Sequence, residues 1–156
     1  MTPLYTIRTA RTRDLEALMA ICLSWDGAPA KRDPALLREL LTQALGDDDS
    51  TLYLALRDSA CVGFAHVTFQ ARPVRLGWRA TIEELHGLPG ERVERALLEA
   101  MVAECRNRGD VIALYLLTQP DLEPRMFEFY ESLGFMERGR DVLVWSGTLE
   151  SEQISL

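Results

Sequence analysis

Two adjacent carboxylates, Glu83 and Glu84, lie near the end of a segment that is expected to form a strand, residues 75–85. Side chains alternate between the two faces of a strand, so we expect at most one of them to point into a groove beside it. Burial raises the pKa of a carboxyl group towards neutrality, which suits it to accept a proton as a general base. His86 is a spare candidate base. A solvated pair of surface carboxylates is the alternative interpretation of the same pattern.

A second candidate feature is the start of the helix that follows, expected near Glu91 directly after Gly90. The first N–H groups of a helix lack partners within it, and together with the helix dipole they favour an anion at that end. Glu91 and Glu94 satisfy the dipole themselves and would repel a bound phosphate, by about 1–4 kcal/mol per charge pair. Arg92 and Arg95 could offset this repulsion with phosphate contacts. The sequence leaves this balance open.

The composition argues against several classes of protein. The chain has 156 residues, of which 47% are apolar and 26% charged, as expected for a globular protein with a core of ordinary size. Its net charge of −7 argues against a nucleic acid or an anionic lipid surface as the main partner. No apolar run is long enough for a membrane span, and the N-terminal residues lack the pattern of a secretory signal. We therefore expect a cytoplasmic protein.

The cysteines and histidines predict neither disulfides nor a metal site. The three cysteines are widely spaced and form no Cys-x-x-Cys pair, which is typical of partly buried thiols in a reducing compartment. The two histidines, His66 and His86, form no metal-ligand pattern with them.

The elements that must position these groups follow from hydrophobic periodicity. Strands are expected at residues 4–8, 51–57, 61–71, 75–85, 111–117, 135–138 and 142–145; helices are expected from Thr12, from Asp33-Pro34 to Gly46, over 91–108, and from Pro124 to Gly134. The near-continuous apolar run at 111–117 is typical of a central buried strand. This order predicts an α/β fold with a twisted mixed sheet of about six or seven strands, flanked by about four helices. We predict one domain over residues 1–147 and a polar tail over 148–156.

This order of elements, together with one motif near its end, resembles the GNAT superfamily of acyl-CoA-dependent N-acyltransferases. The motif is Phe129-Tyr130-Glu131-Ser132-Leu133-Gly134-Phe135, and the resemblance covers about residues 4–147. Three weaker stretches add to it: Ile7-Arg8-Thr9-Ala10-Arg11-Thr12-Arg13-Asp14-Leu15, Cys61-Val62-Gly63-Phe64-Ala65, and Arg95-Ala96-Leu97-Leu98-Glu99-Ala100.

The resemblance implies transfer of an acetyl group from acetyl-CoA to a primary amine of a small molecule or peptide, by direct attack in a ternary complex. The fourth and fifth strands of this family splay apart and admit the pantetheine arm. By resemblance, a carboxylate of Glu83 or Glu84 takes the proton of the amine, and Tyr130 protonates the departing thiolate. A phenol with a pKa near 10 suits a thiolate near 8.5 only with local tuning. Homodimers are frequent in the superfamily.

The resemblance also implies a set of cofactor-binding residues: Leu85, His86, Gly90, Glu91, Arg92, Val93, Glu94, Arg95, Glu123 and Met126. The sequence departs from the family at two places in this set. Without a gap, the family loop Gln/Arg-x-x-Gly-x-Gly/Ala aligns with residues 89–94, where Arg92 and Glu94 replace the two small residues. An alternative alignment places residues 82–85 at the family's strand end and leaves the loop about three residues short, so the motif is broken in either case. Glu123 and Met126 stand where the family often has Asn and Ala.

These departures leave two alternatives to an acetyltransferase. One is a GNAT-like domain without activity, which keeps the fold for binding or oligomerisation. The other is an enzyme that binds a different ligand between the splayed strands. Trp25 and Trp78 could line an acceptor pocket or serve the core, as aromatic residues usually do.

Overall fold

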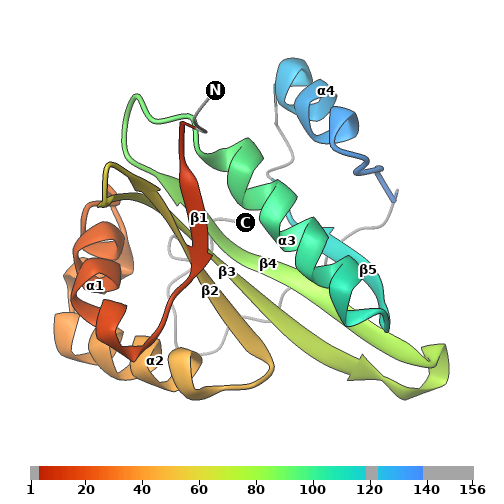
Figure 1. Ribbon diagram of the computed structural model, residues 1–156, viewed down its shortest axis with the longest axis horizontal. Helices are drawn as coiled ribbons and strands as arrows, with labels where there is room; N and C mark the ends of the chain where they lie inside the picture. The colour runs from red at the N-terminus through yellow and green to blue at the C-terminus, as the bar shows by residue number, and fades with distance from the viewer. Residues whose placement is uncertain (1–3, 119–122, 139–156) are drawn as a thin grey trace. The chain divides into compact units, whose positions relative to one another are not determined.

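The computed structural model describes residues 4–118 and 123–138 (Figure 1). They belong to two units, one ending at Leu116 and the other beginning at Leu117. Within the described residues, the first unit holds the sheet and helices α1, α2 and α3, and the second holds helix α4. The predicted domain boundary at residue 147 and the polar tail after it lie outside the described residues.

The sheet has five strands in the described residues, in the order β1-β2-β3-β4-β5. They are β1 (Thr6–Thr9), β2 (Ser50–Arg57), β3 (Ala60–Arg72), β4 (Gly77–Gly87) and β5 (Val111–Leu116). The first four pair antiparallel, and β5 pairs parallel to β4. The mixed sheet expected from the meander and the strand–helix–strand unit is therefore confirmed.

Two expectations about the strands differ from the structure. Residues 135–138 do not form a strand, and the strand predicted at 142–145 lies outside the described residues. The run at 111–117 was expected to be a central buried strand; β5 is only partly buried, with Ile112 53% exposed, and any strand that the residues after 138 add to the sheet lies outside the described residues. Apolar composition alone does not determine how fully a strand is buried.

Helices cover the sheet on both faces (Figure 1). They are α1 (Leu15–Leu23), α2 (Pro34–Gly46) and α3 (Glu94–Arg108). The α1 and α2 helices form a buried cluster with Leu52, Leu54 and Phe64 of the sheet. Thr51 points to the other face, because side chains alternate along β2, and its hydroxyl donates to Glu104 of α3 at 3.1 Å.

The start of α2 agrees with the sequence, whereas the start of α1 does not. Asp33 accepts a hydrogen bond of 3.0 Å from the Leu36 N–H, and Pro34 occupies the first helical position. Thr12 was expected to cap α1, but residues Thr12–Asp14 form a short 3₁₀ turn and α1 begins at Leu15.

The reason for this later start is the Asp14 carboxylate. It accepts two hydrogen bonds of 2.8 Å from the guanidinium of Arg8 on β1, and a third of 2.8 Å from the Arg11 N–H. Asp14 is buried, and the hydrogen bonds from Arg8 and then from Arg11 lower its pKa to about 2 against its desolvation. This pair fixes the first strand to the entry of the first helix.

We expect Asp14→Asn to lower the free energy of unfolding by about 1–2 kcal/mol at neutral pH, a range that allows for the partial exposure of Arg8. The pKa of Asp14 is lowered from 3.8 to about 2 in the folded protein. Its contribution is therefore complete above about pH 4 and is lost as the pH falls towards 2. Urea unfolding of wild type and variant across this range measures the difference, which should shrink with acidification.

Glu16→Gln is the matched control. Glu16 pairs with Arg38 at 2.6 Å, but both side chains are exposed, so little change in stability is expected. A deficit of Asp14→Asn that stayed constant down to pH 2 would show that the ion pair is not its source.

Candidate functional site

The end of β4 is the part of the sheet where pairing changes. The last parallel pair between β4 and β5 is Ile82 with Leu116, whereas the pairing of β4 with β3 continues to Gly87. Within the described strands, residues 83–87 are thus bonded to β3 alone. This is the stretch in which the fourth and fifth strands were expected to part.

A β-bulge at this point sets the direction of the two neighbouring carboxylates. The register of β4 against β3 shifts at Glu83, so that Glu83 is the extra residue and Glu84 lies opposite His66. Glu83 accepts a hydrogen bond of 2.6 Å from the hydroxyl of Thr68. His66 and Thr68 lie two residues apart on β3 and share a face. Both carboxylates therefore lie on that face, and the expectation that alternation would separate them is wrong.

This shared face is the one that α1 and α2 cover, because His66 pairs with Leu52 of their cluster. Desolvation, and then the negative charge of Glu83, raises the pKa of Glu84, although Glu84 as a whole residue is exposed. Burial, and then the charge of Glu84, raises the pKa of the Cys22 thiol on α1 to about 12. Glu84 thus stands near α1 with a carboxyl group that holds its proton more tightly than usual.

His86 packs against the C-terminal end of α1. Its ring stacks on Trp25 with centroids 4.5 Å apart and an interplanar angle of 7°, and its Nε2 lies 3.4 Å from the hydroxyl of Ser24. Burial lowers the pKa of His86, against the opposing effect of the Glu94 charge. The imidazole is therefore mostly neutral near pH 7 and joins β4 to the segment after α1.

Between β4 and α3 the chain turns at Gly90, which has a φ of +83°, and reaches the helix through Val93. Val93 is fully buried. A Cβ atom on Gly63 would lie 2.6 Å from Cγ2 of Val93, and one on Gly87 would lie 2.8 Å from it. These two glycines face each other across β3 and β4. Only glycine at both positions lets Val93 lie this close to the sheet.

Of the two glutamates near the beginning of α3, Glu91 is paired with other side chains and Glu94 turns towards β4. Glu91 pairs with Arg57 at 2.7 Å and accepts a hydrogen bond of 2.8 Å from the hydroxyl of Tyr5. Glu94 turns towards the end of β4, where its Oε1 lies 3.7 Å from the position that a Cβ on Gly87 would occupy. The repulsion expected from Glu91 is thus offset by a cation within the protein.

The beginning of α3 remains suitable for an anion. Val93 is its N-cap and makes no side-chain hydrogen bond to the first turn, and the first N–H groups of a helix have no partners within it. Arg92 is exposed, and Arg95 lies 3.8 Å from Glu99 on the next turn. The residues of this region therefore fit the diphosphate of a CoA thioester despite the missing glycines. Leu85 precedes His86 on β4 and pairs with Ala65, so its side chain points to the face of the sheet opposite to that of His86.

The second unit holds the remaining predicted site residues on α4 (Pro124–Ser132) or at its start. The ring of Tyr130 lies 5.4 Å from that of Phe129 and 6.3 Å from that of Phe135. Glu123 is the N-cap of α4, and Met126 is partly buried in its first turn. The positions of the two units relative to each other are not determined (Figure 1), so Tyr130 and Glu84 are not brought together by this structure.

Sequence reasoning missed Tyr5 and Arg57, which are far from the loop in sequence. It also missed the pair of His66 and Ser50, whose Nε2 and Oγ lie 2.7 Å apart beside the carboxylates. Burial lowers the pKa of His66, while the charges of Glu83 and Asp47 oppose that shift. The acidic segment before Ser50 was the one sequence signal that could have pointed to this pair.

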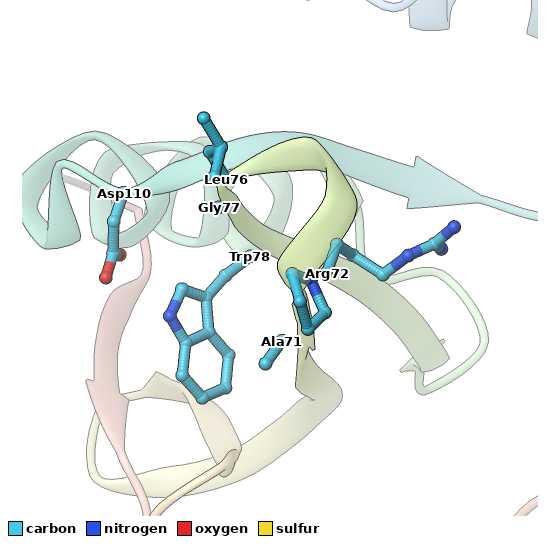
Figure 2. A pocket seen from close by; sticks show the side chains of 7 residues that line it. Ala71, Arg72, Leu76, Gly77, Trp78 and Asp110 are labelled. Atoms are coloured by element: carbon cyan, nitrogen blue, oxygen red, sulfur yellow. The ribbon is translucent and has the colours of Figure 1, made fainter.

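A shallow depression lies at the other end of β4, beside the turn that joins it to β3 (Figure 2). Its lining residues are Ala71, Arg72, Pro73, Leu76, Gly77, Trp78 and Asp110. Trp78 is about 26 Å along the strand from His86, at roughly 3.3 Å per residue. Of the two tryptophans considered for an acceptor pocket, only Trp25 is therefore near the carboxylates.

Two further properties concern the described residues alone. These residues contain no group of three or more His, Cys, Asp or Glu side chains that could hold a metal ion. None of their helices is long and apolar enough to cross a membrane.

Comparison with solved structures gives the same fold. A probable acetyltransferase has a TM-score of 0.79 at 20% identity, with 93% of this chain and 99% of that chain covered. The aminoglycoside acetyltransferase AAC(6′)-Iy, in complex with a bisubstrate analogue of CoA and acetylneamine, has a TM-score of 0.73 at 22% identity, with 92% and 98% covered. A transcriptional regulator from Bacillus halodurans C-125 has a TM-score of 0.72 at 23% identity, with 92% and 99% covered.

Comparison of the sequence itself identifies one family. Among curated proteins, none matches the chain. The model of the acetyltransferase (GNAT) family matches residues 13–135, which include the loop before α3, the β4 carboxylates and Tyr130. With this match over most of its length, on this fold, the chain belongs to the acetyltransferase (GNAT) family.

Proposed function

We propose that this protein transfers an acetyl group from acetyl-CoA to a primary amine of a small molecule or peptide. The observation that carries this proposal is that an uncapped helix start packs against the same end of β4 that carries Glu84 on its other face. Val93, which precedes α3, contacts the glycine that ends β4, three residues after Glu84. A helix end suited to an anion and a candidate base therefore lie at the same end of β4, on opposite faces of the sheet.

The diphosphate would lie against the first turn of α3, with Arg92 and Arg95 beside it. The pantetheine arm would then extend along residues 83–87 of β4, whose backbone has no described strand on the β5 side. Acetyl-CoA supplies the activated acyl group, and the chain supplies the positions of its diphosphate and its thioester. The donor needs no metal, and the amine attacks the thioester carbonyl carbon directly.

Glu84 is the proposed general base. Its carboxylate takes a proton from the nitrogen of the neutral amine as the amine attacks and the C–N bond forms; the C–S bond then breaks and the CoA thiolate leaves. Glu83 is the weaker candidate because its carboxylate accepts the hydrogen bond from Thr68. The pKa of Glu84 is raised by desolvation and by Glu83, and this brings it closer to that of an amine.

Tyr130 is the proposed general acid, which gives its phenolic proton to the departing CoA thiolate. This role rests on the family motif around it, from Phe129 to Phe135, and on its position in α4. His86 is neutral and stacked, so its proposed part is to hold the segment after α1 beside the acceptor amine.

Binding of acetyl-CoA is the first test. A ligand that binds only the folded protein adds about 2.7 kcal/mol of stability at 100 times its dissociation constant. We expect millimolar acetyl-CoA or CoA to raise the Tm by several degrees in a thermal-shift assay, and calorimetry to show one site per chain. No shift with either ligand at millimolar concentration would remove the proposed function.

The roles of the side chains are tested by turnover. Glu84→Gln and Tyr130→Phe should each lower kcat by about 10²–10⁴-fold while the affinity for acetyl-CoA stays nearly unchanged. Release of the CoA thiol, followed with a thiol reagent across a panel of primary amines, measures the rate.

The pH profile separates Glu84 from the titration of the amine itself. Because the pKa of Glu84 is raised above the ordinary 4.5 of a glutamate, its carboxylate becomes protonated, and can no longer act as a base, as the pH falls through that raised pKa. Glu83→Gln removes the neighbouring charge, lowers the pKa of Glu84 and should move the acidic limb of kcat/KM to lower pH. An acidic limb at the same pH in wild type and Glu83→Gln, with the same amine, would exclude Glu84 as the titrating base.

A further inference from the structure

We propose that Tyr5, Arg57 and Glu91 form a clamp that holds the loop before α3 in position and cancels its negative charge, and so sets the affinity for acetyl-CoA. The inference rests on the proposed function, because it names the residues that prepare that same site. Within it, the three side chains are positioning residues: they act on the loop and do not touch the reacting atoms.

The hydroxyl of Tyr5 lies at the centre of the clamp. It donates to Oε2 of Glu91 at 2.8 Å, and it accepts from a guanidinium nitrogen of Arg57 at 3.0 Å and from the backbone N–H of Arg92 at 3.1 Å. A phenol has one proton to donate and two lone pairs to accept with, so every hydrogen-bonding position of this oxygen is used.

The clamp connects three segments that are far apart in sequence. Tyr5 lies just before β1, and Arg57 is the last residue of β2, whose neighbour Leu56 pairs with Thr6. Glu91 lies 86 residues after Tyr5, in the loop. The loop is thereby tied to the β1–β2 edge of the sheet on one side, while Val93 is seated between the glycines of β3 and β4 on the other.

One consequence is geometric. The backbone N–H of Arg92 donates to the Tyr5 hydroxyl and is therefore not free to bind a ligand. The N–H groups that can bind an anion are those of the first turn of α3, which begins at Glu94. The guanidinium of Arg57 also lies over the Tyr5 ring, 5.2 Å from its centroid. Two attachments on opposite sides leave the loop little freedom, and a preorganised loop binds its anion with a smaller loss of entropy.

The other consequence is electrostatic. Glu91 places a negative charge in the loop, and its side chain is only 19% exposed, so water screens it poorly. The hydrogen bond to Tyr5 and then the charge of Glu91 raise the pKa of Arg57, which therefore stays cationic. With Arg57 in place the pair is neutral, and a diphosphate near the loop meets no net charge from it.

Dissociation constants of two thioesters separate these effects. The probes are acetyl-CoA, measured by calorimetry, and S-acetylpantetheine, which lacks the diphosphate and is measured by displacement of acetyl-CoA.

Arg57→Met leaves Glu91 without a cationic partner and should weaken acetyl-CoA binding about tenfold. Arg57→Met/Glu91→Gln removes both charges and should recover most of that loss. Tyr5→Phe keeps the ring but frees the loop, and should weaken acetyl-CoA binding about threefold.

Binding of S-acetylpantetheine should be the same in all these variants and in wild type. Arg38→Met is the matched control: it removes an exposed arginine from α2, which packs on the opposite face of the sheet from α3, and should leave both constants unchanged.

Three outcomes would overturn the clamp. One is an equal weakening of both thioesters in Arg57→Met, which would indicate general damage to the fold. Another is a double variant no better than Arg57→Met, and the third is unchanged acetyl-CoA affinity in Tyr5→Phe and Arg57→Met. If wild type itself bound no acetyl-CoA, the proposed function would fail and the clamp with it. Normal binding by wild type with any of the three outcomes would remove the clamp alone.

Discussion

The contact of Val93 with Gly63 and Gly87 is the constraint on which the candidate site depends. With its side chain seated on the two paired glycines, Val93 brings the beginning of α3 against the end of β4. Any Cβ at either glycine would meet Val93 at 2.8 Å or less, and the helix would have to move away. The beginning of α3 is thus held against the end of β4 by the absence of a Cβ atom at two positions.

Negative charge is the difficulty that this arrangement must overcome, in a chain with a net charge of −7 that is proposed to bind a polyanion. The structure separates the acidic groups by function. Glu91 is neutralised by Arg57 and hydrogen-bonded by Tyr5, whereas Glu83 and Glu84 lie together on the α1–α2 face, where desolvation and then the charge of Glu83 raise the pKa of Glu84. An acidic surface on that face is also favourable for a cationic amine. Under the proposed function, the same acidic composition would favour the amine on the α1–α2 face and is offset by Arg57 at the loop before α3.

The periodicity of the sequence predicted most helices and strands within a few residues, because local hydrophobic patterns determine them. The face of Glu83 and Glu84 could not be predicted, since the bulge depends on pairing with β3 and not on β4 alone. The neutralisation of Glu91 depends on Tyr5, 86 residues away, and no local pattern records that contact. Thr12 was a plausible cap by residue type, but a carboxylate bound to Arg8 of the first strand determined where α1 begins. The family motif at Tyr130 identified the superfamily correctly, while its catalytic part stays a prediction.

The most direct test of the account is the response of individual amides to CoA. In ¹⁵N-labelled protein, saturating CoA should shift the amide resonances of Glu94 and Ala96 strongly, since these N–H groups stand at the first turn of α3. The Arg92 amide, which Tyr5 already binds, should move much less. Pantetheine, without the diphosphate, should leave the first-turn amides in place. If CoA bound at saturation while Glu94 and Ala96 did not respond, the helix start would not be the anion site, and the central claim would be wrong.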